Sequence, residues 1–362
     1  MSSWRCSLII FGYYIVLKKK LRTSQSSRFF ALFSGVVLSL ILSGFIFLLN
    51  KTNPFEVFTS SFFAIFGSLY GITETFLIAI PIAACALAVG VAAMIKIWNI
   101  GAEGQFVAGA LGAGISGVYF SFLPSGLLIP LMFTSGILFS MILGVIPGIL
   151  KAMLNVNEIL VTLMLNYMAT LFMLFLLYGP LKGLDNFPYS KYIPDNTFLP
   201  LLFSSRLHVG VFIVIIIAII LYFFMKKSIW GYELRVLGES YKAARYAGIG
   251  VKRNIILIMV ISAAIAGVGG ILEVIGVQHR LQPSIAQGYG FTGIIVSWLS
   301  KNNPLTTLWV SFLIAGLFVS GSDMQISYSL PTSIIKVFQG IVFLSILASD
   351  IFTDYYISLE KK

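Results

Sequence analysis

Long apolar runs alternate with short polar stretches along almost the whole chain. A helix across the hydrocarbon of a bilayer takes about 20 residues, and most of the runs reach that length. The run at 288–300 is short for a span, although a start at Ile285 would lengthen it. We therefore predict an all-α polytopic membrane protein with ten transmembrane helices, over residues 29–49, 75–97, 103–120, 126–150, 157–178, 208–225, 254–277, 288–300, 304–320 and 332–348.

Two further apolar stretches are not expected to cross the membrane. Residues 7–17 are too short, and their basic residues follow the run, whereas a signal peptide places them before it. Residues 1–28 are therefore predicted to be a cytoplasmic or interfacial leader. The segment 53–74 is broken by Pro54, Glu56 and Gly67, which favours an interfacial or re-entrant piece.

Basic residues fix the predicted orientation, because cytoplasmic loops of membrane proteins are enriched in Lys and Arg. With ten spans and a cytoplasmic amino terminus, eighteen Lys and Arg residues fall on the inner side and six on the outer side. Both termini are then cytoplasmic, with a transmembrane domain at 29–348 and a tail at 349–362. The basic loop 226–253 faces the cytoplasm, and the proline-rich loop 179–207 faces outward.

Composition narrows the possible functions. The chain is 58% hydrophobic and 10% charged, and its net charge of +11 is scattered between apolar runs, which argues against nucleic-acid binding. Cys6 and Cys85 lie far apart and suggest neither a disulfide nor a metal site. The chain has no GxxxxGK[ST] phosphate loop and only two histidines, His208 and His279, so an enzyme is not expected.

The stretch 230–253 is the longest charged interruption of the apolar pattern. Its glycines bracket two short potential helices, and Ser240 is a suitable N-cap for a helix over 241–247 that Gly248 would end. Ala243, Ala244 and Ala247 would form a small-residue face that a groove on a partner protein could accept. The alternative is an ordinary basic cytoplasmic loop.

Polar residues within or beside the spans are candidates for contact with a solute. Asn99, Glu103 and Gln105 lie in a glycine-containing turn that is either a broken helix lining a cavity or a plain cytoplasmic connection. Glu158 and Asn166 share a helix face, where they could meet solute or bond to a neighbouring helix. Glu273 and Lys336 lie at similar depth, and their ion pair could serve either packing or transport.

Three of these motifs resemble one family. The stretch Gly231 to Ile249 looks like the cytoplasmic coupling loop of ABC-importer permeases of the branched-chain amino acid, sugar and nucleoside superfamily. Residues 99–105 (NIGAEGQ) and 157–167 (NEILVTLMLNY) resemble signatures of its simple-sugar and nucleoside branch. The resemblance covers residues from about 75 to 348 and implies an ATPase-coupling role for Gly231, Gly238, Glu239, Ser240, Ala243, Ala244, Arg245 and Gly248.

The resemblance implies a permease subunit of an ATP-driven importer, with a nucleoside as the favoured solute and a simple sugar as the alternative. It further implies a separate cytoplasmic ATPase that uses ATP and Mg, a second and related permease chain, and an extracytoplasmic solute-binding protein. This chain itself would bind no cofactor. Two rival hypotheses are an ion-coupled transporter that works alone and a membrane scaffold that transports nothing.

Overall fold

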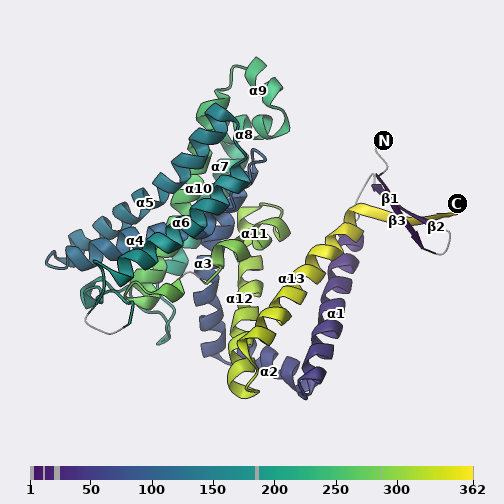
Figure 1. Ribbon diagram of the computed structural model, residues 1–362, viewed down its shortest axis with the longest axis horizontal. Coiled ribbons are helices and arrows are strands. Elements are labelled where there is room, and N and C mark those ends of the chain that lie inside the picture. The colour runs from purple at the N-terminus through teal and green to yellow at the C-terminus, as the bar shows by residue number, and fades with distance from the viewer. Residues whose placement is uncertain (1–3, 11–12, 20–24, 184–186, 286, 362) are drawn as a thin grey trace. The chain divides into compact units, whose positions relative to one another are not determined.

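The computed structural model describes residues 4–10, 13–19, 25–183, 187–285 and 287–361. Helices make up most of this part of the chain (Figure 1). The chain divides into two compact units, Met1–Ser68 with Leu317–Lys362 and Leu69–Gly316, and the division falls within one helix, α12.

The elements in chain order are β1 (Trp4–Ile10), β2 (Tyr13–Lys19), α1 (Gln25–Leu49), α2 (Pro54–Phe66), α3 (Leu69–Ala93), α4 (Ala102–Tyr119), α5 (Ser125–Leu154), α6 (Glu158–Tyr178), η1 (Asp195–Thr197), α7 (Gly210–Lys227), α8 (Ile229–Glu239), α9 (Tyr241–Tyr246), α10 (Val251–Glu273), η2 (Val274–Gln278), η3 (Pro283–Ile285), α11 (Tyr289–Leu299), α12 (Pro304–Ser327), α13 (Thr332–Asp354) and β3 (Tyr355–Lys361).

Helices α3 and α10 form the centre of the larger unit. In the most apolar 18-residue stretch of each span, 83% and 72% of the residues are buried. Small residues let the neighbouring helices approach closely, as is usual between membrane helices. A Cβ added to Gly109 of α4 would overlap the backbone of Gly267 in α10, and one on Gly144 of α5 would overlap the Ala263 side chain. The core of this unit is therefore a tightly packed set of α3, α4, α5 and α10.

In the smaller unit, α1 and α13 pack along each other, and a Cβ on Gly35 would overlap Ser349. Buried apolar side chains, among them Phe47, Val57 and Phe338, join α1, α2 and α13. Strands β1, β2 and β3 form an antiparallel sheet in that order, so the two ends of the chain pair with each other.

All ten predicted spans coincide with helices, but ten membrane crossings are not established. Within the part of the chain that the structure describes, seven helices are long and apolar enough to cross a membrane, or eight if a bent pair counts as one span. Helix α11 has only 11 residues, which is about half the length of a span. The bent pair is α1 and α2, which meet at 117°, so the segment after residue 53 does not simply continue the first helix.

The chain is helical as predicted, and strands that the sequence did not predict are added at its two ends. The described parts of the leader form the hairpin β1–β2, and the tail adds β3. The apolar stretch 7–17 is rich in Ile, Val and Tyr, residues that favour strands, and seven-residue strands need far less length than a spanning helix. Among the described residues between 25 and 354, helices are the regular elements, with one isolated β-bridge between Leu201 and His208.

Candidate functional site

The turn that carries Asn99, Glu103 and Gln105 lies deep inside the larger unit. We call the end of this unit that carries α8 and α9 the coupling end, and the end that carries the loop 179–207 the far end. Asn99 contacts Ser262, three helical turns along α10 from its start at the coupling end, which is about 16 Å. Gly104 contacts Asn166, eight residues along α6, which is about 12 Å from the same end. The chain therefore leaves α3 at the coupling end and returns into the bundle before α4 begins.

Asn99 joins three segments through hydrogen bonds at this depth. Its Nδ2 donates to Gln105 Oε1 at 2.8 Å and to Ser262 Oγ at 2.7 Å, while its Oδ1 accepts from the Gly101 N–H. Ser262 Oγ in turn donates to the carbonyl of Ala88 at 2.6 Å. Asn99 and Gln105 are both 1% exposed. Their hydrogen-bonding groups are thus used within the chain in this conformation.

Asn166 completes the unwound turn from the side of α6. Its Oδ1 accepts from the Gly104 N–H and its Nδ2 donates to the Ile100 carbonyl, both at 2.7 Å. These two bonds satisfy an N–H group of the first turn of α4 and a carbonyl of the turn before it, as the interior of a membrane requires. A side chain at Gly104 would overlap Asn166, so the close approach depends on glycine.

Glu103 lies where the amino-terminal ends of two helices meet. It belongs to the first turn of α4, and its carboxylate accepts from the N–H groups of Gly288 and Gly290, at 2.8 Å and 2.5 Å, at the start of α11. Helix amino termini carry unpaired N–H groups and partial positive charge, which a carboxylate stabilises. The Glu103 carboxylate therefore links the first turn of α4 to the start of α11. The two backbones lie close together here, since a Cβ on Gly290 would overlap the backbone of Glu103.

The other predicted intramembrane residues are placed apart from this network. Glu158 pairs with Lys151 at 2.9 Å near the coupling end, so it does not share a site with Asn166 despite the common helix face. Glu273 is 5% exposed and accepts from Gln278 Nε2 at 2.9 Å. Lys336 belongs to the smaller unit, and its ion pair with Glu273 stays a prediction.

At the coupling end, α8 packs against residues 94–96, which directly follow α3. Gly231, Leu234, Leu237 and Gly238 form its buried face. A Cβ on Gly238 would overlap the Met94 carbonyl oxygen, and Glu239 pairs with Lys96 at 3.7 Å on the surface. Residues 94–96, which lead directly to Asn99, are therefore in direct contact with α8.

Helix α9 forms as the sequence predicts, but one of the three alanines in and just after it points the other way. Ser240 accepts from the Ala243 N–H as N-cap, and Gly248 has a positive φ of 74°. Ala244, however, is 0% exposed, because on a helix it is rotated away from the face that Ala243 and Ala247 share. Ala244 therefore packs within its own chain, and Tyr246, which is 93% exposed, is the most prominent side chain here.

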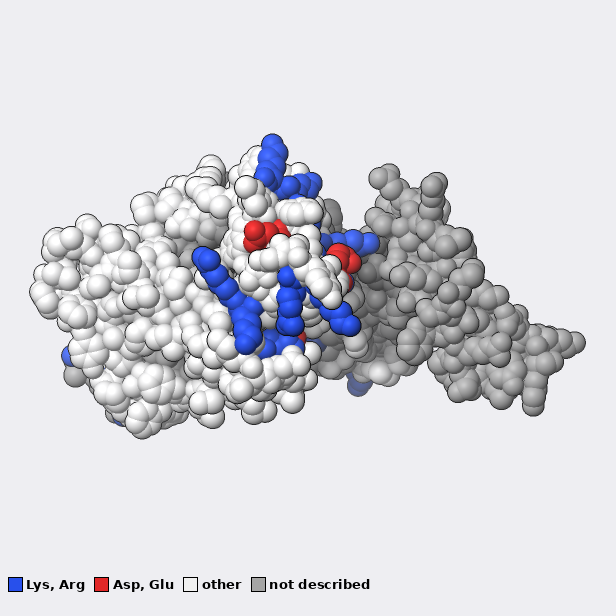
Figure 2. All heavy atoms as spheres, turned by 90° about the horizontal axis from the view of Figure 1, so that it is seen from above, with Lys and Arg blue, Asp and Glu red and all other residues white. Residues whose placement is uncertain are grey.

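The surface around α8 and α9 is strongly basic. Figure 2 shows Lys and Arg side chains gathered on this end of the larger unit around two smaller acidic patches. The exposed basic residues of this surface are Lys226, Lys227, Arg235, Lys242, Arg245, Lys252 and Arg253.

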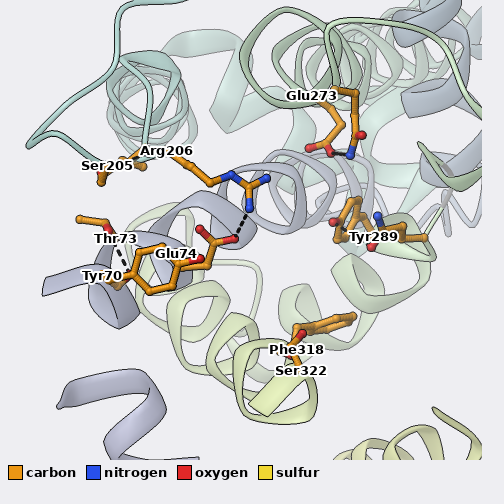
Figure 3. A network of polar contacts seen from close by, with 12 residues as sticks. Tyr70, Thr73, Glu74, Ser205, Arg206, Glu273, Tyr289, Phe318 and Ser322 are labelled. Carbon is orange, nitrogen blue, oxygen red and sulfur yellow. Dashed lines mark hydrogen bonds and ion pairs between the residues drawn. The ribbon is translucent and has the colours of Figure 1, made fainter. Parts of the chain in front are cut away.

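Sequence reasoning missed the polar residues next to α11. Tyr289 is 5% exposed and donates to Gln287 Oε1 at 3.2 Å, and Figure 3 shows it in the same region as Glu273. Glu74 and Arg206 form a 3.1 Å ion pair between α3 and the far-end loop. The signal in the sequence was the short eighth run, which Gln287 precedes and Gly288 and Tyr289 begin, since a half-length apolar run with a glycine start indicates a half-helix.

The chain was compared with known proteins. Residues 71–347 match the family described as the branched-chain amino acid transport system / permease component. The glucose ABC transporter permease protein TsgB13 of Haloferax volcanii is 30% identical, over 90% of this chain and 88% of its own. The nucleoside ABC transporter permease protein NupB of Lactococcus lactis is 32% identical, over 84% and 86%, and the guanosine ABC transporter permease protein NupP of Bacillus subtilis is 30% identical, over 91% and 95%.

The family match runs from α3 into α13. It includes α4 and α11, whose first turns meet at Glu103, and the pair α8 and α9. The apolar helices agree with a multi-pass protein of the plasma membrane. This chain belongs to the permease family of the branched-chain amino acid transport system, whose members of similar sequence include nucleoside and sugar ABC permeases.

Proposed function

We propose that this chain is the membrane-spanning permease subunit of an ATP-driven importer and forms the translocation pathway for a nucleoside, with a purine nucleoside favoured. The observation that carries the proposal is the similarity over most of the chain to two permeases named for nucleoside and guanosine transport. A simple sugar is the second candidate, because a relative of similar extent is named for glucose.

Competition between solutes tests this choice of substrate. Cells that express the whole transporter should take up labelled guanosine, and excess unlabelled adenosine should compete while ribose should not. Deletion of this chain should abolish guanosine uptake. Uptake of labelled ribose that is lost on deletion, with guanosine uptake unchanged, would replace the nucleoside by the sugar.

A second, related permease chain is proposed as the partner within the membrane. The matches include two permease proteins from Lactococcus lactis, NupB and NupC, and two from Bacillus subtilis, NupP and NupQ. The matches to NupB and NupP cover 84% and 91% of this chain, while those to NupC and NupQ cover 69% and 64%. This difference supports a heterodimer in which this chain takes the place of NupB or NupP.

The remaining partners are a cytoplasmic ATPase and an extracytoplasmic solute-binding protein. In this proposal the chain crosses the membrane ten times, both termini are cytoplasmic, and α8 and α9 dock into the ATPase through the exposed residues Ala243, Arg245 and Tyr246. The concentration of basic residues at the coupling end supports this orientation. ATP and Mg are used by the partner ATPase, and this chain holds no cofactor.

The contact between α8 and the end of α3 supports a mechanism. Closure of the ATPase pair would move α8 and α9, and the Gly238 contact would pass that movement to residues 94–96 and on to the Asn99 turn. Asn99, Glu103, Gln105 and Asn166 would then exchange their internal hydrogen bonds for bonds to solute as the pathway opens.

A further inference from the structure

Between η2 and α11, the described residues 279–285 and 287–288 form no helix longer than the 3-10 turn η3. A Cβ on Gly114 of α4 would touch the Leu281 side chain at 2.5 Å, and the Gly288 N–H donates to Glu103 of the same helix. Gly114 comes eleven positions after Glu103 in α4, which is a distance of about 16 Å along the helix. Leu281 therefore lies toward the far end and Gly288 lies about 16 Å deeper, toward the middle of the unit.

An irregular segment at this depth cannot face lipid. Its backbone N–H and C=O groups would lack partners in hydrocarbon, so such segments occur only where protein covers them or where they line water. Gln287 and Ser284 are nevertheless exposed in the larger unit. Gln287 directly precedes Gly288, so its amide lies near the depth of Glu103.

Polar side chains in and beside this segment form two hydrogen-bonded groups. Gln282 Nε2 donates to Gln278 Oε1, whose own Nε2 donates to Glu273, and Tyr289 donates to Gln287. Gln278 ends the π-helical turn η2, and such turns are frequent at functional sites. We call these five residues the glutamine strip: Glu273, Gln278, Gln282, Gln287 and Tyr289.

We propose that the glutamine strip binds the hydroxyl groups of the transported solute and that the solute is uncharged. Each glutamine offers both donors and acceptors, and a carboxylate accepts from hydroxyls, so together they can replace the water around a sugar or a ribose. The one charged group among the five residues is the Glu273 carboxylate, which disfavours a solute with a net negative charge. The two cations nearby have other partners, since Arg280 lies over the rings of Tyr189 and Tyr192 and Arg206 pairs with Glu74. This assignment rests on the proposed function, because it requires that a solute cross this subunit.

Cysteine labelling of the assembled transporter in whole cells tests the assignment. Gln287→Cys and Ser284→Cys are made in a chain whose Cys6 is replaced by serine, since Cys85 is 0% exposed. Both are treated with a charged, membrane-impermeant thiosulfonate. Leu171→Cys, at a 63% exposed position on the apolar helix α6, is the control for a lipid-facing site.

We expect the reagent to label Gln287→Cys in the strip and Ser284→Cys beside it, and to leave the Leu171→Cys chain unlabelled. Guanosine at about ten times its Kd should slow labelling roughly tenfold, as for any occupied site. Two results in cells that do take up guanosine would overturn the assignment while the proposed function stands. One is no labelling at either position, and the other is labelling whose rate guanosine leaves unchanged. Protection by ribose in cells that take up ribose and not guanosine supports the strip and overturns the choice of nucleoside.

Discussion

Glu103 is the residue on which the interior of the larger unit most depends. It is 4% exposed and holds two backbone N–H groups from another helix, while its own helix begins one residue before it. A carboxylate buried at this depth is costly unless it is hydrogen-bonded, and here the two N–H groups supply the bonds.

Replacing Glu103 by glutamine should loosen α11 from α4. The amide keeps one acceptor oxygen but turns a donor NH2 toward an N–H group, so one buried bond is lost at a cost of about 1–3 kcal/mol. Thermal unfolding of the detergent-solubilised protein should show a lower Tm. Glu239→Gln, at an exposed ion pair with Lys96, is the matched control and should leave Tm unchanged. Equal Tm values for both variants would contradict the role given to Glu103.

His208 makes the far end of the molecule sensitive to acid. Burial, and then the nearby His279, lowers the pKa of His208 from 6.5 to about 4. The ring is 1% exposed, lies next to Gly210 and Gly276, and accepts from the Gly210 N–H through Nδ1. The folded protein therefore keeps His208 neutral at pH values where the unfolded chain is already protonated.

Because the folded pKa is the lower one, stability is full above about pH 6.5 and falls as the pH drops toward 4. At pH 5 this single group should cost about 2 kcal/mol of unfolding free energy. Tm measured at pH 7.5 and pH 5.0 should fall less in His208→Gln than in the unchanged chain. If Tm falls equally in both proteins, His208 does not contribute to the loss of stability in acid.

At the scale of elements, the contact of α8 with the end of α3 has the clearest consequence for transport. Gly238→Ala would drive a methyl group into the Met94 carbonyl, and the helices can separate only at a strain of about 1–3 kcal/mol. We expect ATP-dependent uptake to fall about tenfold while the protein still inserts. Gly126→Ala, with no atom within 4 Å of the added Cβ, should transport normally. Normal uptake in Gly238→Ala would remove this contact from the mechanism.

Helix α9 should act through its exposed residues. Tyr246→Ala should reduce binding of the purified ATPase and ATP-dependent uptake, with Tm unchanged, because the side chain is 93% exposed and contributes little to the fold. Tyr178→Ala, a 68% exposed tyrosine at the opposite end of the larger unit, serves as control. Ala244→Trp would by contrast unsettle the fold, since Ala244 is buried. ATPase binding that survives Tyr246→Ala would place the docking surface elsewhere.

Apolar periodicity sufficed to predict helices at all ten spans, together with α8, α9 and the cap at Ser240, because these depend on local composition and local hydrogen bonds. It could not settle the depth of the Asn99 turn, the half-helix nature of α11 or the bond from Glu103 to Gly288. These depend on contacts between residues more than 100 positions apart. The prediction that Ala244 faces outward is wrong for a similar reason, because the packing of neighbouring parts of the chain decides whether so small a side chain is buried.

At the scale of the whole molecule, the central claim is that this chain moves a nucleoside only when a separate ATPase drives it. An ion-coupled transporter would need no such partner. The two accounts therefore differ in what must be added to the membrane, and the assembled protein can be tested directly.

The most direct measurement is guanosine uptake into proteoliposomes that contain both permease chains, with the solute-binding protein supplied on the binding side. We expect uptake when the ATPase and Mg-ATP are both present. We expect none when either is omitted or when an ion gradient replaces them. Uptake driven by an ion gradient without the ATPase would contradict the account.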